Sequence, residues 1–166
     1  MDHITVSPHP TLCKKPNTLE SLRSYDIVLN VSDHLDPELT EWLLTNRIQS
    51  YWLPLGEAYV MPLENIYGAL LILWRAERDE KNVLIHCIAG RNRSRMTLDC
   101  YRYMMTGEYS EDSAMMLNVK DSQLPGIYRL EVFLQKCLEV FERSEVAGGA
   151  FDVTLADWVK REALRF

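Results

Sequence analysis

The sequence predicts an α/β fold in which a central, mostly parallel sheet of about four to five strands is flanked by helices. Two observations support this fold class. Short apolar runs alternate along the chain with longer segments of helical periodicity, which is typical of parallel strands covered by helices. The run 25–31 is apolar and rich in β-branched residues, as expected for a strand that is buried on both faces of a sheet.

The first half of the chain is expected to supply three strands and three helices. Asp36 is a side-chain cap for the second helix, and Pro37 occupies its first turn. The third helix carries Ile66 and Leu70 at the spacing of a stripe that faces a core. The strands are expected over 4–6, 25–31 and 48–53, and the helices over 18–23, 36–46 and 62–78.

The second half is expected to contain one further strand and several helices. The strand is expected over 83–85, and the helices over 93–105, from Ser110, over 126–142 and over 154–164. We predict one domain over 1–146. The segment 147–166 is interpreted as a linker containing two glycines, followed by an amphipathic helix that packs on the same domain. A helix that binds a partner or a second copy is the alternative interpretation.

The segment 85–94, Ile-His-Cys-Ile-Ala-Gly-Arg-Asn-Arg-Ser, carries the chemistry. It lies between an apolar strand and a helical segment, so it is expected to form a tight loop at a helix N-terminus. Such a loop points successive backbone N–H groups into a concavity that binds phosphate, and the same field lowers the pKa of a thiol at its base. The residues expected to surround a phosphate are Ile88, Ala89, Gly90, Arg91, Asn92 and Arg93.

Each residue type in this loop suits phosphoryl transfer. Cys87 is the expected nucleophile, because a thiolate can form a phosphocysteine and split one hydrolysis into two steps. Arg93 offers a planar fork of donors to two phosphate oxygens, and Gly90 allows a close turn. Ser94 can donate a hydrogen bond to the sulfur. His86 is expected to hold the cysteine backbone by a hydrogen bond.

These residues resemble the signature of the cysteine-dependent protein tyrosine phosphatase superfamily, His-Cys-x5-Arg-Ser/Thr. The Ala89-Gly90 pair and the Arg93-Ser94 ending are most similar to its dual-specificity branch. The resemblance implies a phosphatase domain over roughly 25–142. It also implies hydrolysis of phosphate monoesters without a metal or other cofactor, since Arg93 and the loop stabilise the transferring phosphoryl group.

Three carboxylates are candidates for the general acid. In the family it is usually an aspartate on a mobile loop roughly 30 residues before the nucleophile. The matching position here is Glu57, since 87 − 57 = 30, and a glutamate departs from the family by one methylene. We place Glu57 first, Asp121 second and Asp33 third. Gln123 is a candidate for positioning the hydrolytic water.

The substrate class rests on the resemblance and on the loop. The sequence shows no counterpart of the loop that makes a deep phenol pocket in tyrosine-specific members. A shallow pocket is therefore expected, with phosphotyrosine on proteins as the leading substrate and phosphoserine or phosphothreonine as further ones. Arg91 is also similar to the basic loop residue of inositol-phosphate and phosphoinositide phosphatases. Those relatives often carry a second basic residue just after the cysteine, where this chain has Ile88.

Two alternatives come from other functional classes. One is a phosphate-binding module with weak or no turnover, which the intact Cys87 and Arg93 disfavour. The other is a cysteine-dependent sulfur-transfer enzyme, since such enzymes also hold a thiolate in an anion-binding loop. The five-residue spacing that closes on Arg93 and Ser94 favours phosphate.

Composition limits the partners and the location. The net charge of −6 argues against a broad surface for nucleic acid or anionic membranes. No apolar run approaches 18 residues, so no membrane span is expected. The N-terminus lacks the pattern of a secretory signal, and a thiolate enzyme needs a reducing compartment, so the expected location is the cytoplasm. The expected partners are a phosphorylated protein or a small phosphomonoester, and the oligomeric state is left open.

The remaining cysteines and histidines are not interpreted as a further site. Cys13, Cys100 and Cys137 are expected to be ordinary thiols. The spacing of His3, His9, Cys13 and His34 matches no compact metal-ligand pattern, so no metal is expected.

Overall fold

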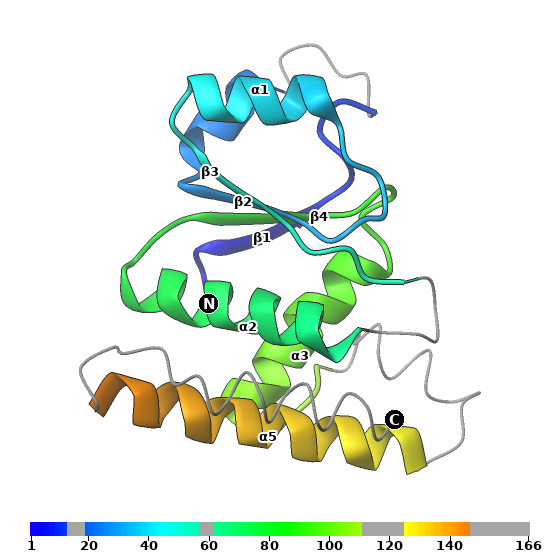
Figure 1. Ribbon diagram of the computed structural model, residues 1–166, viewed down its shortest axis with the longest axis vertical. Helices are drawn as coiled ribbons and strands as arrows, with labels where there is room; N and C mark the ends of the chain where they lie inside the picture. Colours follow the sequence, from blue (N-terminus) through cyan, green and yellow to red (C-terminus); the bar gives the residue numbers. More distant parts are fainter. Residues whose placement is uncertain (13–18, 57–61, 111–124, 147–166) are drawn as a thin grey trace.

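The computed structural model describes residues 1–12, 19–56, 62–110 and 125–146. Nine elements lie in these ranges (Figure 1). The strands are β1 (Ile4–Ser7), β2 (Ile27–Asn30), β3 (Gln49–Trp52) and β4 (Val83–His86). The helices are the 3-10 helix η1 (Glu20–Ser24) and the α-helices α1 (Pro37–Thr45), α2 (Leu63–Arg78), α3 (Arg93–Thr106) and α5 (Pro125–Val146).

The four strands form one parallel sheet in the order β1-β4-β2-β3. This confirms the predicted α/β fold class. The central strands β2 and β4 are buried along their whole length, whereas all four residues of the edge strand β3 are exposed. The carboxyl ends of parallel strands share one edge of the sheet, so the loops that follow β4, β2 and β3 meet there.

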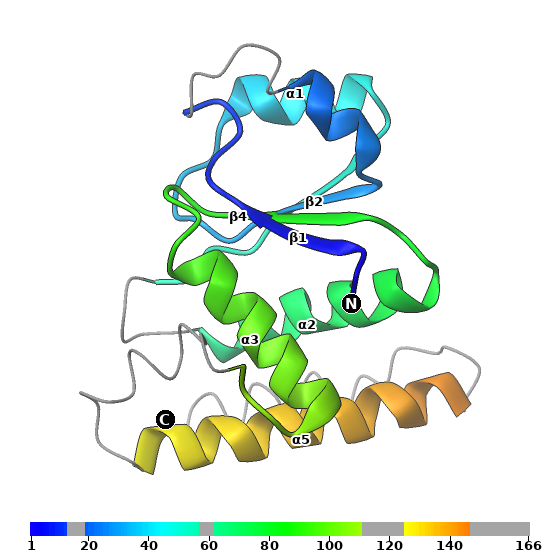
Figure 2. The same ribbon diagram turned by 180° about the vertical axis from the view of Figure 1, so that it is seen from behind.

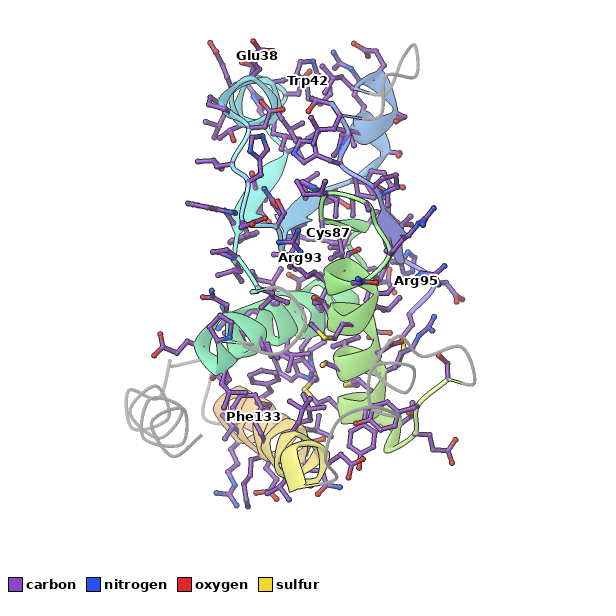
Figure 3. All side chains as sticks on the ribbon, turned by 90° about the vertical axis from the view of Figure 1, so that its right-hand side faces the viewer. Glu38, Trp42, Cys87, Arg93, Arg95 and Phe133 are labelled. Carbon is purple, nitrogen blue, oxygen red and sulfur yellow. The ribbon has the colours of Figure 1, made fainter. Side chains whose placement is uncertain are left out.

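Helices cover both faces of the sheet. Helices α2 and α3 lie against one face with α5 beyond them, and η1 and α1 cover the other face (Figures 1 and 2). In the side view, Glu38 and Trp42 of α1 lie at one end of this stack and Phe133 of α5 at the other (Figure 3). The strand period of two explains the two cores, because Leu29 and Ile85 join the larger cluster under α2, α3 and α5 while Val28 joins the cluster under α1.

The element boundaries follow the predicted signals closely. The Asp36 carboxylate caps α1 by accepting a hydrogen bond from the Leu39 N–H at 3.1 Å. Helix α3 ends at Gly107, whose φ of 74° suits glycine. Helix α5 extends about a turn beyond its predicted end at residue 142, and Pro62 caps α2 rather than lying inside it.

Some predictions lie outside the described residues. These are the short helix from Ser110 and the whole segment 147–166. The assignment of a single domain over 1–146 therefore stays a prediction. No described helix combines the length and the apolar character that a membrane crossing would require.

Candidate active site

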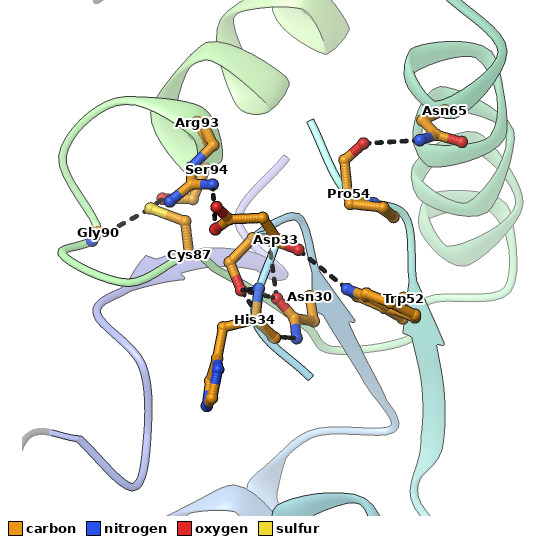
Figure 4. A network of polar contacts seen from close by, with 11 residues as sticks. Asn30, Asp33, His34, Trp52, Pro54, Asn65, Cys87, Gly90, Arg93 and Ser94 are labelled. Atoms are coloured by element: carbon orange, nitrogen blue, oxygen red, sulfur yellow. Dashed lines mark hydrogen bonds and ion pairs between the residues drawn. The ribbon is translucent and has the colours of Figure 1, made fainter. Parts of the chain in front are cut away.

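The segment from Cys87 to Asn92 forms a loop that joins the carboxyl end of β4 to the amino end of α3. Cys87 and Arg93 lie together where α3 begins (Figure 3). The loop folds around the sulfur. The Gly90 N–H donates to Cys87 Sγ at 3.3 Å, and the Ser94 hydroxyl lies 3.4 Å from the same atom (Figure 4). The sequence predicted this strand, loop and helix, and the contact between Ser94 and the sulfur.

Gly90 is required in this loop for two reasons. Its φ is 67°, in the region that side chains with a Cβ rarely adopt. A Cβ at this position would also lie 2.5 Å from the Pro8 nitrogen and 2.6 Å from the Ser7 carbonyl carbon. The backbone just after β1 therefore presses against the loop, and the His9 N–H donates to the Ile88 carbonyl at 3.0 Å. The end of β1 thus supports the loop from behind.

The environment of Cys87 favours its thiolate. Burial would raise the pKa of this thiol, but the Ser94 hydroxyl, the Ser94 and Gly90 backbone and the Arg93 charge act against burial and leave the pKa below its ordinary value. Because the thiolate is the nucleophilic form, these groups prepare the sulfur for attack on an electrophile.

Arg93 is buried at the start of α3 and is already paired. Its Nη1 donates to Asp33 Oδ1 at 2.7 Å (Figure 4). The Arg93 side chain is only 10% exposed, whereas that of Asp33 is 68% exposed. The hydrogen bond from Arg93 and its positive charge lower the pKa of the Asp33 carboxyl. Asp33 is therefore a carboxylate at neutral pH, in contact with the arginine that would bind phosphate.

The loop that carries Asp33 is held by a compact network of hydrogen bonds. Asn30, the last residue of β2, accepts from the Ser32 N–H at 2.9 Å and from its hydroxyl at 2.7 Å, and its amide donates to the His34 carbonyl at 2.8 Å. From the neighbouring strand, Trp52 Nε1 donates to the Ser32 carbonyl at 2.9 Å (Figure 4). Asp33 thus projects from a loop that is fixed on both sides.

His86 lies beneath the loop as an uncharged ring. Burial and, to a smaller extent, the nearby His9 lower its pKa to about 4, against the opposing effect of the Cys87 backbone. The ring packs edge-on against His9 at a centroid distance of 4.9 Å. Neither of its nitrogens makes a hydrogen bond of standard geometry within the described ranges. The Cys87 backbone does raise the pKa of this ring, so the expected hydrogen bond to the cysteine backbone stays a prediction.

The other predicted site residues divide into two groups. The loop residues Ile88, Ala89, Arg91 and Asn92 lie where the motif places them, with Arg91 and Asn92 exposed. Glu57, Asp121 and Gln123 lie outside the described residues. No cluster of three or more metal-ligating side chains occurs in the described part of the chain.

The sequence analysis missed the groups that support the loop and its neighbour. Ser32 and Trp52 hold Asp33 in place, and Ser7 and Pro8 back the phosphate loop. Asn30 offered a signal, since it is a polar residue in an otherwise apolar buried strand and such residues need partners. Nothing local indicates the contacts of Ser7 and Pro8, because they join segments about 80 residues apart.

Comparisons with known proteins bear on the fold. The sequence matches no protein-family model and no curated protein. The structure is similar to that of DUSP15, with a TM-score of 0.60 and 15% identity over 86% of this chain and 92% of that one. It is also similar to the core catalytic domain of the PP-IP phosphatase SIW14 from S. cerevisiae, with a TM-score of 0.59 and 16% identity over 89% and 90% of the two chains.

A third similar structure is PTPMT1 in complex with PI(5)P, with a TM-score of 0.60 and 17% identity over 82% of this chain and 93% of that one. These likenesses cover nearly the whole of the compared chains, although the identities are low. The chain therefore has the fold of the cysteine-dependent protein tyrosine phosphatase superfamily, which the motif from His86 to Ser94 predicted.

Proposed function

We propose that this protein hydrolyses phosphate monoesters through a phosphocysteine formed on Cys87. One observation carries the proposal: a buried thiol with a lowered pKa lies in a backbone loop that ends on a buried arginine. Neither feature alone requires phosphate. Together they support a nucleophile at the base of an anion-binding loop.

The first step is attack of the Cys87 thiolate on phosphorus, with cleavage of the bond between phosphorus and the ester oxygen. The transferring group carries its charge on three oxygens. We expect free loop N–H groups to bind these oxygens. Arg93 can bind them too, because its bond to Asp33 uses Nη1 and a guanidinium carries further N–H donors on Nη2 and Nε. The leaving oxygen takes a proton from a general acid and departs as an alcohol or phenol.

In the second step, water attacks the phosphocysteine and the sulfur leaves as a thiolate. The water loses its proton to the base form of the same acid, and inorganic phosphate is released. The Ser94 hydroxyl, 3.4 Å from the sulfur, stabilises the departing thiolate. The same contact lowers the pKa of Cys87 in the free enzyme.

Asp33 is poorly suited to be the acid. An acid must be protonated before the first step, but the bond from Arg93 lowers the pKa of Asp33. Glu57 therefore remains our first candidate and Asp121 our second, with Gln123 proposed to position the water.

The proposed physiological substrate is phosphotyrosine on a protein, with phosphoserine and phosphothreonine as further substrates. An inositol phosphate or phosphoinositide is the second candidate. Arg91 is exposed on the phosphate loop, where it could pair with a second phosphate. Two of the similar structures also carry names that point to such compounds, a PP-IP phosphatase and a complex with PI(5)P.

The test is hydrolysis of p-nitrophenyl phosphate across pH in EDTA, with Cys87→Ser measured alongside. We expect the variant to lose about 10⁴-fold or more in kcat. Cys100→Ala is the matched control, because it removes a buried thiol outside the loop and should keep wild-type turnover. Folded wild-type protein without turnover, or a fully active Cys87→Ser variant, would contradict the proposal. Phosphate binding without turnover would instead identify a binding module.

A further inference from the structure

Three neighbouring strands end at the proposed site, and each contributes a different chemical group. Cys87 follows β4, the loop after β2 carries Asp33, and Trp52 ends β3. His86, Asn30 and Trp52 are level across the sheet, since Asn30 is paired in register with both of the others. With neighbouring strands about 4.8 Å apart, the backbone of Trp52 lies roughly 10 Å from that of His86. Thiol, carboxylate and indole thus follow one another along one edge.

The carboxylate of Asp33 restricts the charge that this edge accepts. A single phosphate in the loop is stabilised by the Arg93 charge and the backbone N–H groups. A second phosphate on the same molecule would extend beyond the loop, past an Asp33 side chain that is 68% exposed. Arg93, which pairs with Asp33, is also the cation that binds the first phosphate, so its charge is already balanced. A further phosphate on this side therefore meets net repulsion.

The indole of Trp52 supplies an exposed aromatic surface next to that carboxylate. Trp52 is 45% exposed although its Nε1 is bound to the Ser32 carbonyl at 2.9 Å. The hydrogen bond limits the rotation of the ring, so contact with a substrate costs little side-chain entropy. Figure 4 shows the indole on the side of Asp33 away from Cys87. A substrate that extends from the loop past Asp33 would therefore extend toward this ring.

We propose that Asp33 and Trp52 form a selective rim that favours aryl esters with one phosphate, such as phosphotyrosine, over inositol compounds with several phosphates. This inference rests on the proposed phosphatase function and names the substrate class of the same site. Asp33 selects against additional negative charge, and Trp52 selects for an aromatic leaving group by ring contact. The rim acts against Arg91, the exposed loop residue whose charge would attract a second phosphate.

The test compares three probes on one set of variants: phosphotyrosine, phosphoserine and inositol 1,4,5-trisphosphate. Asp33→Asn keeps the shape and an acceptor for Arg93 but removes the charge. We expect it to raise kcat/KM for the trisphosphate relative to phosphotyrosine by about 5-fold at low salt, and the gain should shrink at high salt. Asp2→Asn is the matched control, since it removes an equal charge from an exposed position before β1 and should leave this ratio unchanged.

The contribution of Trp52 is tested with phosphotyrosine and phosphoserine, the two probes that carry one phosphate. Trp52→Leu should lower kcat/KM for phosphotyrosine relative to phosphoserine by about 3- to 10-fold. Trp52→Phe keeps a ring and should lose less. Thermal unfolding of each variant confirms that the fold persists.

Two outcomes would overturn the rim. In one, Asp33→Asn lowers kcat/KM for all three probes by the same factor, which would show that the carboxylate only orients Arg93. In the other, the ratios between probes do not change in either variant. Calorimetric binding of the same probes to Cys87→Ser forms of each variant separates this inference from the proposed function. If the variants change the relative affinities for the three probes as expected, but the wild-type protein shows no turnover, the selectivity of Asp33 and Trp52 would be supported and the proposed hydrolase activity rejected.

Discussion

Cys87 and Cys100 are both buried cysteines, one directly after β4 and one inside α3, yet their thiols have opposite acid–base character. Their exposures are 3% and 1%. Burial and the nearby Asp99 raise the pKa of Cys100 to about 12, whereas hydrogen bonds and Arg93 bring that of Cys87 below its ordinary value despite burial. Burial alone therefore does not decide reactivity. The difference lies in the donors that the loop directs at one sulfur.

The most direct test of this difference between Cys87 and Cys100 is to measure how fast each thiol reacts. We expect iodoacetamide at neutral pH to alkylate Cys87 at least about 10³-fold faster than Cys100, because only the thiolate reacts. Peptide mass spectrometry after timed quenching measures both rates in one sample. Inorganic phosphate or vanadate should protect Cys87 if the loop binds oxyanions. Equal rates at the two thiols would show that the loop does not activate its cysteine.

A substitution in the loop backbone tests how the donors are held. Gly90→Ala adds a Cβ that collides with the backbone of Ser7 and Pro8 and strains a φ of 67°. We expect it to lower the free energy of unfolding by about 3 kcal/mol and turnover by about 100-fold or more.

Gly107→Ala is the matched control for this variant. Its φ of 74° carries the same conformational cost, but a Cβ there meets nothing within 4 Å among the described residues apart from those next to it in the chain. It should cost only about 1–2 kcal/mol and leave turnover unchanged. Denaturant unfolding and p-nitrophenyl phosphate hydrolysis measure both effects. If the two variants behave alike, the contact between the loop and the end of β1 is unimportant.

The contribution of a single donor is smaller. Ser94→Ala removes the hydroxyl 3.4 Å from Cys87 Sγ, so the pKa of the thiol should rise. We expect the pH midpoint of alkylation to move upward by about one pH unit and kcat to fall about 10-fold. Ser94→Thr keeps a hydroxyl and should restore both. An unchanged alkylation profile in the alanine variant would assign the low pKa to the backbone donors and Arg93.

The smallest effect concerns the ion pair between the exposed Asp33 and the buried Arg93. Since the folded pKa of Asp33 lies below its ordinary value of 3.8, the pair stabilises the fold above that pH and loses its contribution as the pH falls through the lower folded value. The difference in Tm between wild type and Asp33→Asn should therefore be present at pH 6 and shrink at more acidic pH. A difference that grows on acidification would contradict the ion pair.

The comparison of the two cysteines also shows why part of the site is readable in the sequence. The spacing from Cys87 to Ser94 lies within one strand–loop–helix unit, so the Gly90 and Ser94 groups that contact the sulfur are close to it in the sequence. Cys100 lies at a core position of a helix, and its inertness follows from the same local pattern. The Gly90 and Ser94 contacts of Cys87 could be predicted because they are local, although the end of β1, far away in the sequence, supports the loop that makes them.

The supporting contacts could not be predicted in the same way. Asp33 was placed third among the acids from its position after a strand, and the structure shows a carboxylate bound to Arg93, 60 residues away. The exposed indole of Trp52 is held near the loop of Asp33 by a hydrogen bond to the carbonyl of Ser32, 20 residues earlier. Such contacts depend on the order of the strands, and a linear sequence does not state which strand lies beside which.

The sequence by itself determined the α/β fold class, the order of the strands and helices along the chain and the identity of the proposed nucleophile and phosphate-binding arginine, because apolar periodicity and short-range loop chemistry are local properties. Tertiary structure alone decided that β4 lies between β1 and β2, and that the end of β1 supports the phosphate loop. It also decided that Asp33 and Trp52 border the proposed site. The physical reason is that parallel strands align their carboxyl ends, so residues distant in sequence meet there only after the sheet has formed.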